Sequence, residues 1–461
     1  MGRRRSCPGA NALAHLYDSM SSLSTSPFAL ETAGAWRRRS APARVRRLSS
    51  FLAAYLAIPV LEVPLFGVSL SAPVFCFLAL DCLLCPIAWR PYRKWILLAA
   101  LFWMAHLFSL TANVFAGNLT AVSTAQACLL VRFGFWMLVL VVTTLLVHRF
   151  GLGLRLAKAL AAGAVALGVL RLAEAAVFGH WGGGNPRFLS QNDYGFGFSA
   201  FAPFAVWLAL ESRGVQRLLA AGGCFALLAA VVGNGSRSSW ITVALGLLLL
   251  SILWSLALAR SFSAGLSHWV GLLLLGAAPV ALLLVAPASL KGPVIERATT
   301  LGRLDHDKPF LARQLLVEKG IRLFQQSPVF GVGAGGFTQT LAPLEIPRAL
   351  SYGSLEEFNR KTPHNSYIKV LAETGLLGAA SLFCLLAVLA WRGLWATLAL
   401  ARRGESWAIP VFTGFFTMSI HLWTLSGLTG TAPWFLYGML AGVVESRRCG
   451  SRDAGRRSRQ M

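Results

Sequence analysis

The apolar run VGLLLLGAAPVALLLVAPASL (Val270–Leu290) is long enough to cross a bilayer as a helix, since about 20 apolar residues span the hydrocarbon core. A polar stretch rich in Gly and Pro follows it, Lys291–His364, in which basic and acidic residues are nearly balanced. The next apolar run begins at Tyr367. Loops longer than about 12–15 residues are usually functional or disordered, so we expect this loop to carry a site.

Composition predicts an integral membrane protein. The 461 residues are 56% hydrophobic and only 13% charged, whereas soluble globular proteins are about 25% charged. The net charge is +24, but the basic residues gather in the tails and in short connections beside apolar runs. This distribution favours contact with anionic membrane lipids and argues against nucleic acid as a partner. None of the eight cysteines lies in the long loop, and their positions give no disulfide framework.

About twelve apolar segments have a length near that of a membrane span. They must be helices, because backbone groups in lipid have to be satisfied within the segment. The sequence therefore predicts an all-α polytopic membrane protein. The approximate spans are 49–67, 71–89, 94–113, 124–147, 154–178, 194–211, 216–233, 238–258, 267–288, 367–391, 406–425 and 431–445.

Lys and Arg residues predict which ends of the spans face the cytoplasm. They concentrate in the even-numbered connections, which the positive-inside rule assigns to the cytoplasm together with both termini. Arginines in the odd connections break this rule, chiefly in the turn Gly233–Ser239 and in the long loop. The predicted divisions are a basic, disordered cytoplasmic tail (1–48), helices one to nine (49–290), a long outer loop with catalytic residues (291–366), helices ten to twelve (367–445) and a second basic cytoplasmic tail (446–461).

Two outer arginines are candidates for binding an anion, because a guanidinium grips phosphate with two donors and stays charged. Arg237 lies at the outer end of a helix predicted to begin at Ser238, and a helix N-terminus itself attracts anions. Arg313 lies early in an amphipathic helix predicted to start at Asp307 and run to Gln326. The alternatives are an arginine that snorkels to the membrane interface and a solvated helix face.

Three other patterns allow structural explanations. Gly331–Gly336 match GxGxxG, but a helical run precedes them where dinucleotide binding needs a strand, so we predict a tight turn or re-entrant segment. Arg171 and Glu174 are three residues apart within a span and could simply pair. His364 stands at the mouth of a span, where an imidazole with an ordinary pKa near ~6.5 suits proton transfer; a structural histidine is the alternative. No second ligand stands at metal-site spacing, so we predict neither a metal nor a cofactor.

Taken together and in order, these motifs resemble the O-antigen ligase and polymerase superfamily of bacterial inner membranes. The similar segments are the SRS turn (Ser236–Ser238), SPVFGVGAGGF (Ser327–Phe337), PHNSY (Pro363–Tyr367) and AETGLLG (Ala372–Gly378). The segment RFLSQN (187–192) is similar to one that precedes a middle span in the family. Family members usually have Pro directly before the Asn, and here Gln191 stands in that place.

The resemblance implies a metal-independent glycosyltransferase of the GT-C type, with one long periplasmic loop, in the bacterial inner (plasma) membrane. Direct displacement at the anomeric carbon would make it an inverting enzyme. It would move a glycan from undecaprenyl pyrophosphate onto a hydroxyl of lipid A-core. His364 would be the general base, and Arg237 and Arg313 would bind the pyrophosphate, with Arg297, Arg303 and Arg322 near enough to compete with Arg313. Further candidates for the site, not tied to a role, are Arg187, Asn192 and Asn365.

Two other functions stay open at this point. A polymerase of the same superfamily would use the growing glycan as its acceptor. A lipid-linked glycan transporter belongs to another class; transporters often place their sites at the bilayer midplane and show repeated halves. The sequence has no such repeat, and its outer charges concentrate in one loop.

Overall fold

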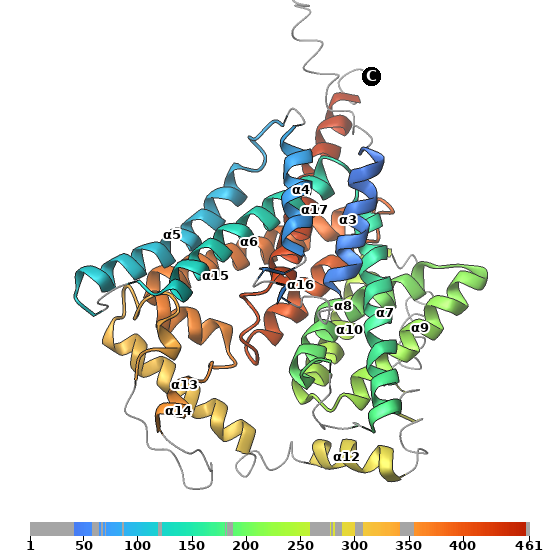
Figure 1. Cartoon of the computed structure of the whole chain (residues 1–461). Helices are drawn as coiled ribbons and strands as arrows, with labels where there is room; N and C mark the ends of the chain where they lie inside the picture. The colour runs from blue at the N-terminus through green and yellow to red at the C-terminus, as the bar shows by residue number, and fades with distance from the viewer. Residues whose placement is uncertain are drawn as a thin grey trace, which may run out of the picture. The chain divides into compact units, whose positions relative to one another are not determined.

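The computed structural model describes residues 41–57, 64–65, 68–69, 71–84, 87–118, 122–179, 181, 188–258, 277, 280–281, 288–299, 308–341 and 355–457. These residues are almost entirely helical (Figure 1). The helices are α3 (Ala43–Leu56), α4 (Ser71–Leu83), α5 (Arg93–Phe115), α6 (Thr124–His148), α7 (Gly153–Phe178), α8 (Gln191–Glu211), α9 (Gly214–Gly233), α10 (Arg237–Leu258), α12 (Ala288–Thr299), α13 (Lys308–Gln326), η4 (Gly336–Thr338), α14 (Leu355–Asn359), α15 (Ser366–Ala401), α16 (Ala408–His421) and α17 (Thr431–Arg457). Two short strands, β1 (Pro64–Leu65) and β2 (Val68–Ser69), pair antiparallel.

Six of the described helices are long and apolar enough to cross a membrane: α5, α6, α7, α9, α10 and α15. Shorter apolar helices occupy the predicted spans at α4 and α16. A helical polytopic membrane protein is therefore confirmed, while the number twelve stays a prediction. Most of predicted span 267–288 lies outside the described residues.

Several hydrogen bonds join helix ends that the sequence predicts to lie on the same side of the membrane. Tyr92, before α5, bonds to His148 at the end of α6. Trp95 of α5 donates to Glu445 of α17, and Ser406 before α16 donates to Glu211 at the end of α8. All of these residues lie at predicted cytoplasmic ends. The starts of α8 and α10, predicted to lie at the opposite ends, are joined by the hydrogen bonds between Gln191 and Asn234. The side that faces the cytoplasm stays a prediction.

The glycine-rich segment after α13 packs into a break in α15. Helix α15 is interrupted at Gly375, which has φ 60° and ψ −156°. The backbone N–H groups of Val332 and Leu376 donate to Ala372 and Pro328 respectively, both at 2.9 Å, so the two chains supply the bonds that the broken helix lacks. A Cβ at Gly331 or Gly375 would lie 2.4 Å from the opposite backbone. This close approach explains the glycines and confirms a tight, backbone-contacting segment.

Helix α13 and this segment share a small apolar core. Leu316, Leu323, Val332, Phe337 and Phe358 are buried in it, together with Ala312 and Ala372. The predicted amphipathic helix 308–326 is confirmed, because its apolar face packs here and on the first turns of α15 (Figure 1). Three boundaries differ from the prediction. Helix α10 begins at Arg237, one residue early, α3 begins at Ala43 inside the predicted tail, where Val45 and Leu52 are buried, and α17 runs on to Arg457.

Candidate active site

His364 lies in the short segment between α14 and α15, in a conformation that costs free energy. Its φ is 48°, and among the described residues it is the only non-glycine residue with a positive φ. Such backbone conformations cost on the order of 1–3 kcal/mol and cluster at functional sites. The next residue, Asn365, caps α15, since its Oδ1 accepts from the backbone N–H groups of Tyr367 and Ile368, each at 3.0 Å. The cap fixes where α15 begins and so restrains His364.

The segment is also held from the other side by the chain that follows α16. The Ser366 backbone N–H donates to Leu422 at 2.9 Å, and the Ser366 hydroxyl donates to Leu425 at 2.7 Å. The Tyr367 hydroxyl donates to the carbonyl of Ser419 at 2.7 Å. These bonds come from residues more than fifty positions away, so the position of His364 depends on the tertiary structure.

The surroundings of His364 favour a neutral imidazole. Burial lowers its pKa below the usual value, and the positive charge of Arg313 lowers the pKa further, while the carboxylate of Asp193 opposes both. The Nδ1 atom is buried and has no hydrogen-bond partner among the described residues. A neutral imidazole is the form that can accept a proton.

Arg313 reaches this site from α13, whose position is fixed by a buried lysine two turns later. Lys319 is fully buried, and its Nζ donates to the carbonyls of Phe337, at 2.6 Å, and of Asn359, at 2.5 Å. Asn359 is five residues before His364. The amine therefore ties α13 to the chain that carries the histidine. Burial lowers the pKa of Lys319 to about 8.

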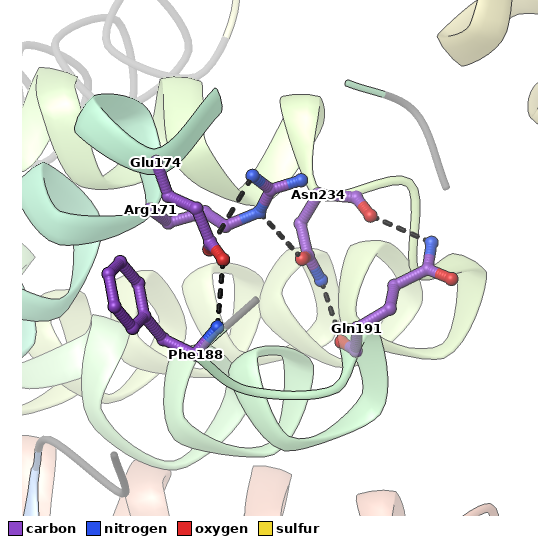
Figure 2. A network of polar contacts seen from close by, with 5 residues as sticks. All are labelled: Arg171, Glu174, Phe188, Gln191 and Asn234. Atoms are coloured by element: carbon purple, nitrogen blue, oxygen red, sulfur yellow. Dashed lines mark hydrogen bonds and ion pairs between the residues drawn. The ribbon is translucent and has the colours of Figure 1, made fainter. Parts of the chain in front are cut away.

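Arg237 is the first residue of α10 and is partly buried. The serines around it bond among themselves: the Ser236 and Ser238 hydroxyls are 3.2 Å apart, and the Ser239 hydroxyl donates to the Ser236 carbonyl at 2.7 Å. The turn before Arg237 is hydrogen-bonded to the start of α8 through Asn234 and Gln191 (Figure 2). These bonds hold the starts of α8 and α10 together, and α8 also carries Asp193.

Two residues that the sequence did not single out for the site border it. Asp193, in the first turn of α8, acts on the charge of His364 and accepts from the Ser190 hydroxyl at 2.6 Å. His421, at the end of α16, has its Nδ1 3.1 Å from the Ser199 hydroxyl, and that hydroxyl lies 2.6 Å from the hydroxyl of Thr242 on α10. The residue after His421, Leu422, accepts from the Ser366 backbone N–H, which places the end of α16 beside the segment of His364. Asp193 follows the RFLSQN segment directly, and a carboxylate at that position could have marked it as a site residue from the sequence.

The structure places the remaining candidate residues in different surroundings. Asn192 lies partly exposed in the first turn of α8, beside Asp193. Asn365 is a helix cap. Arg187 and Arg303 lie outside the described residues, whereas Arg297 and Arg322 are on α12 and α13; Arg322 pairs with Glu318 at 2.6 Å. Among the residues that the structure describes, no group of three His, Cys, Asp or Glu side chains could hold a metal ion.

Residues 222–383 match the model of a protein family described as O-antigen ligase. This segment is therefore similar to the O-antigen ligase family. No curated protein matches the chain. The O-antigen ligase segment includes Arg237, Arg313 and His364, so the match covers all three residues for which the sequence predicted roles.

The O-antigen ligase segment does not include the whole site. Asp193 and His421 lie before and after it, on α8 and α16. Asn192 and Arg187 also lie before it. The described structure joins these flanking helices to the segment through the hydrogen bonds of Gln191 and of Ser199. The candidate site is thus built from the family segment and from the helices on either side of it.

Proposed function

We propose that this protein is an O-antigen ligase-type glycosyltransferase. It moves a glycan from undecaprenyl pyrophosphate to an acceptor hydroxyl of lipid A-core, on the periplasmic face of the bacterial inner membrane. The observation that carries the proposal is that His364, held at a φ of 48° just before α15, has its pKa lowered by burial and by the positive charge of Arg313, within the segment that matches the O-antigen ligase family. Transfer from a diphosphate to a hydroxyl needs a base and an anion-binding group in the same site.

In the proposed reaction, a ring nitrogen of neutral His364 takes the proton of the acceptor hydroxyl. The acceptor oxygen forms a bond to the anomeric carbon as the bond from that carbon to the diphosphate oxygen breaks. Undecaprenyl pyrophosphate leaves with the electron pair, and Arg237 and Arg313 stabilise its charge without a metal ion. Direct displacement inverts the configuration at the anomeric carbon. General base catalysis of this kind contributes roughly 10²–10⁴-fold to the rate.

The lowered pKa of His364 has two opposing effects on this reaction. A lower pKa keeps the imidazole unprotonated at neutral pH, but it also makes the imidazole a weaker base. Asp193 limits the loss of basicity, because its charge raises the pKa of His364. When the imidazole takes the proton, Asp193 also stabilises the imidazolium that forms.

Gene deletion with surface polysaccharide analysis tests the proposal in cells. Loss of a ligase removes all long glycan from lipid A-core on a gel, whereas loss of a polymerase of the same superfamily leaves core that carries a single repeat. Restoration by the wild-type gene and not by His364→Ala would support the catalytic assignment. Restoration of the wild-type pattern by His364→Ala would refute it, and unchanged glycan after deletion would refute the function itself.

A further inference from the structure

Two charged residues of α7 are buried where the proposed reaction does not use them directly. The exposed fractions of Arg171 and Glu174 are 1% and 2%, and Arg171 Nη1 lies 3.9 Å from Glu174 Oε2. Ionisable groups inside a membrane span are costly and usually serve a function. A buried ion pair also needs hydrogen bonds from other groups, so the groups that it bonds show which parts of the chain it holds.

The pair is bonded to both connections that border the site (Figure 2). Arg171 Nε donates to Asn234 Oδ1 at 3.2 Å, in the turn before α10. Glu174 Oε1 accepts from the backbone N–H of Phe188 at 3.0 Å, in the chain before α8. The guanidinium also lies over the ring of Tyr194, 5.6 Å from its centroid. One buried pair therefore contacts three separate parts of the chain.

The two connections are bonded to each other as well. Asn234 Nδ2 donates to the Gln191 carbonyl at 2.9 Å, and Gln191 Nε2 donates to the Asn234 carbonyl at 2.7 Å. Asn234 is fully buried. Hydrogen bonds within a buried polar network restrain its members, so the bonds of Asn234 to Arg171 and Gln191 restrain the turn before α10. Arg237 follows Asn234 by three residues, and Asp193 follows Gln191 by two.

We propose that the Arg171–Glu174 pair, acting through Asn234, positions Arg237 for the diphosphate of the lipid-linked donor. The inference rests on the proposed function, and it assigns to these residues a positioning role, since none of them needs to touch the substrate. Arg171 supplies the link to the turn, Glu174 neutralises Arg171 and anchors the chain before α8, and Gln191 closes the network.

Asn234 is the position at which to test the inference. Removing Arg171 or Glu174 leaves the other charge buried without its partner, which destabilises a protein strongly. Asn234→Ala removes the link and keeps the pair. The probe is undecaprenyl pyrophosphate, which carries the diphosphate and no sugar, and its affinity is measured for the full-length protein in lipid nanodiscs. Undecaprenyl monophosphate serves as the comparison ligand.

We expect Asn234→Ala to weaken binding of the pyrophosphate by about tenfold, the size of one lost hydrogen bond to a charged group. Gln191→Ala should weaken it less. Ser251→Ala should not change it, because the Ser251 hydroxyl donates to Leu247 within α10 and bonds no other element among the described residues. Thermal unfolding is followed for each variant. If Asn234→Ala does not fold, Gln191→Ala gives the same test from a partly exposed position.

A double-mutant cycle separates positioning from general destabilisation. If Asn234 acts through Arg237, Asn234→Ala causes no further loss of affinity in an Arg237→Ala background. Additive losses, or wild-type affinity in both network variants, would overturn the inference. If Arg237→Ala itself bound undecaprenyl pyrophosphate like the wild type, the pyrophosphate clamp of the proposed function would be wrong instead, so the two failures are distinguishable.

Discussion

Charges of opposite sign act on the imidazole of His364, and they give the site a predictable pH dependence. Arg313 lowers the pKa of His364 and Asp193 raises it, while burial lowers it more than either charge. A general base works only when it is unprotonated. The rate of transfer by the wild-type protein should therefore stay constant as the pH is lowered to about 6.5, the ordinary pKa of histidine. It should fall only at a pH below that value, where the imidazole becomes protonated.

The two neighbouring residues should shift this acidic fall in opposite directions. Arg313→Gln removes a cation, which raises the pKa of His364 and moves the fall to higher pH. Asp193→Asn removes an anion, which lowers the pKa and moves the fall to lower pH. The measurement is kcat/KM between about pH 5 and pH 8. The variants are compared by the pH at which kcat/KM has fallen to half its maximum, and not by the maximum itself. A midpoint that stays in place in both variants would show that these charges do not act on the base.

At the scale of elements, the contact between α13 and the chain before His364 depends on Lys319. Lys319→Met should leave the carbonyls of Phe337 and Asn359 without their buried donor, at about 1–3 kcal/mol for each group left unsatisfied. We expect a lower thermal midpoint, and proteolysis within 355–364 at protease concentrations that spare the wild type. Lys308→Met, on the exposed start of the same helix, is the matched control. Equal proteolysis of both variants would argue against the anchor.

The break in α15 gives a second prediction at this scale. Gly375→Ala places a Cβ 2.4 Å from the backbone of Val329, so the glycine-rich segment must move away and lose its bonds to the break. We expect loss of folded protein or of transfer activity, measured by size-exclusion chromatography and by assay. Gly222→Ala is the control, because a Cβ there meets nothing within 4 Å and alanine favours a helix. Normal behaviour of Gly375→Ala would contradict this packing.

At the scale of the whole molecule, the sidedness of the spans is testable apart from the chemistry. We expect alkaline phosphatase to be active when inserted after the exposed Leu341, because it folds only in the periplasm. Green fluorescent protein should fluoresce at the C-terminus, because that end is expected in the cytoplasm. Inactive phosphatase in the loop would place the loop on the cytoplasmic side of the membrane, where the candidate site could not reach a periplasmic acceptor.

The sequence predicted the helical class and several elements, because each depends on local signals. Long apolar runs predicted α5, α6 and α7, and Asp307 followed by Pro309 predicted the start of α13 to within a residue. The break in α15 could not be predicted, because it depends on hydrogen bonds from a segment more than forty residues earlier. The extension of α3 into the basic tail likewise depends on Val45 and Leu52, which are buried on contact with other elements.

The site was predicted in part, for a related reason. His364, Arg237 and Arg313 stand in motifs or at helix starts, which sequence patterns can indicate. Asp193 and His421 come from helices that only the fold brings to His364 and Arg313. The pairing of Arg171 with Glu174 was anticipated from their spacing, but their bonds to Asn234 and Phe188 could be found only in three dimensions.

Transfer by the purified full-length protein tests the central claim most directly. The assay uses lipid nanodiscs, an undecaprenyl pyrophosphate-linked glycan, lipid A-core as acceptor and a metal chelator in the buffer. We predict transfer by the wild type, and a loss of roughly 10²–10⁴-fold in His364→Ala with donor binding retained, because only the base is removed. Transfer by His364→Ala at the wild-type rate would contradict the account.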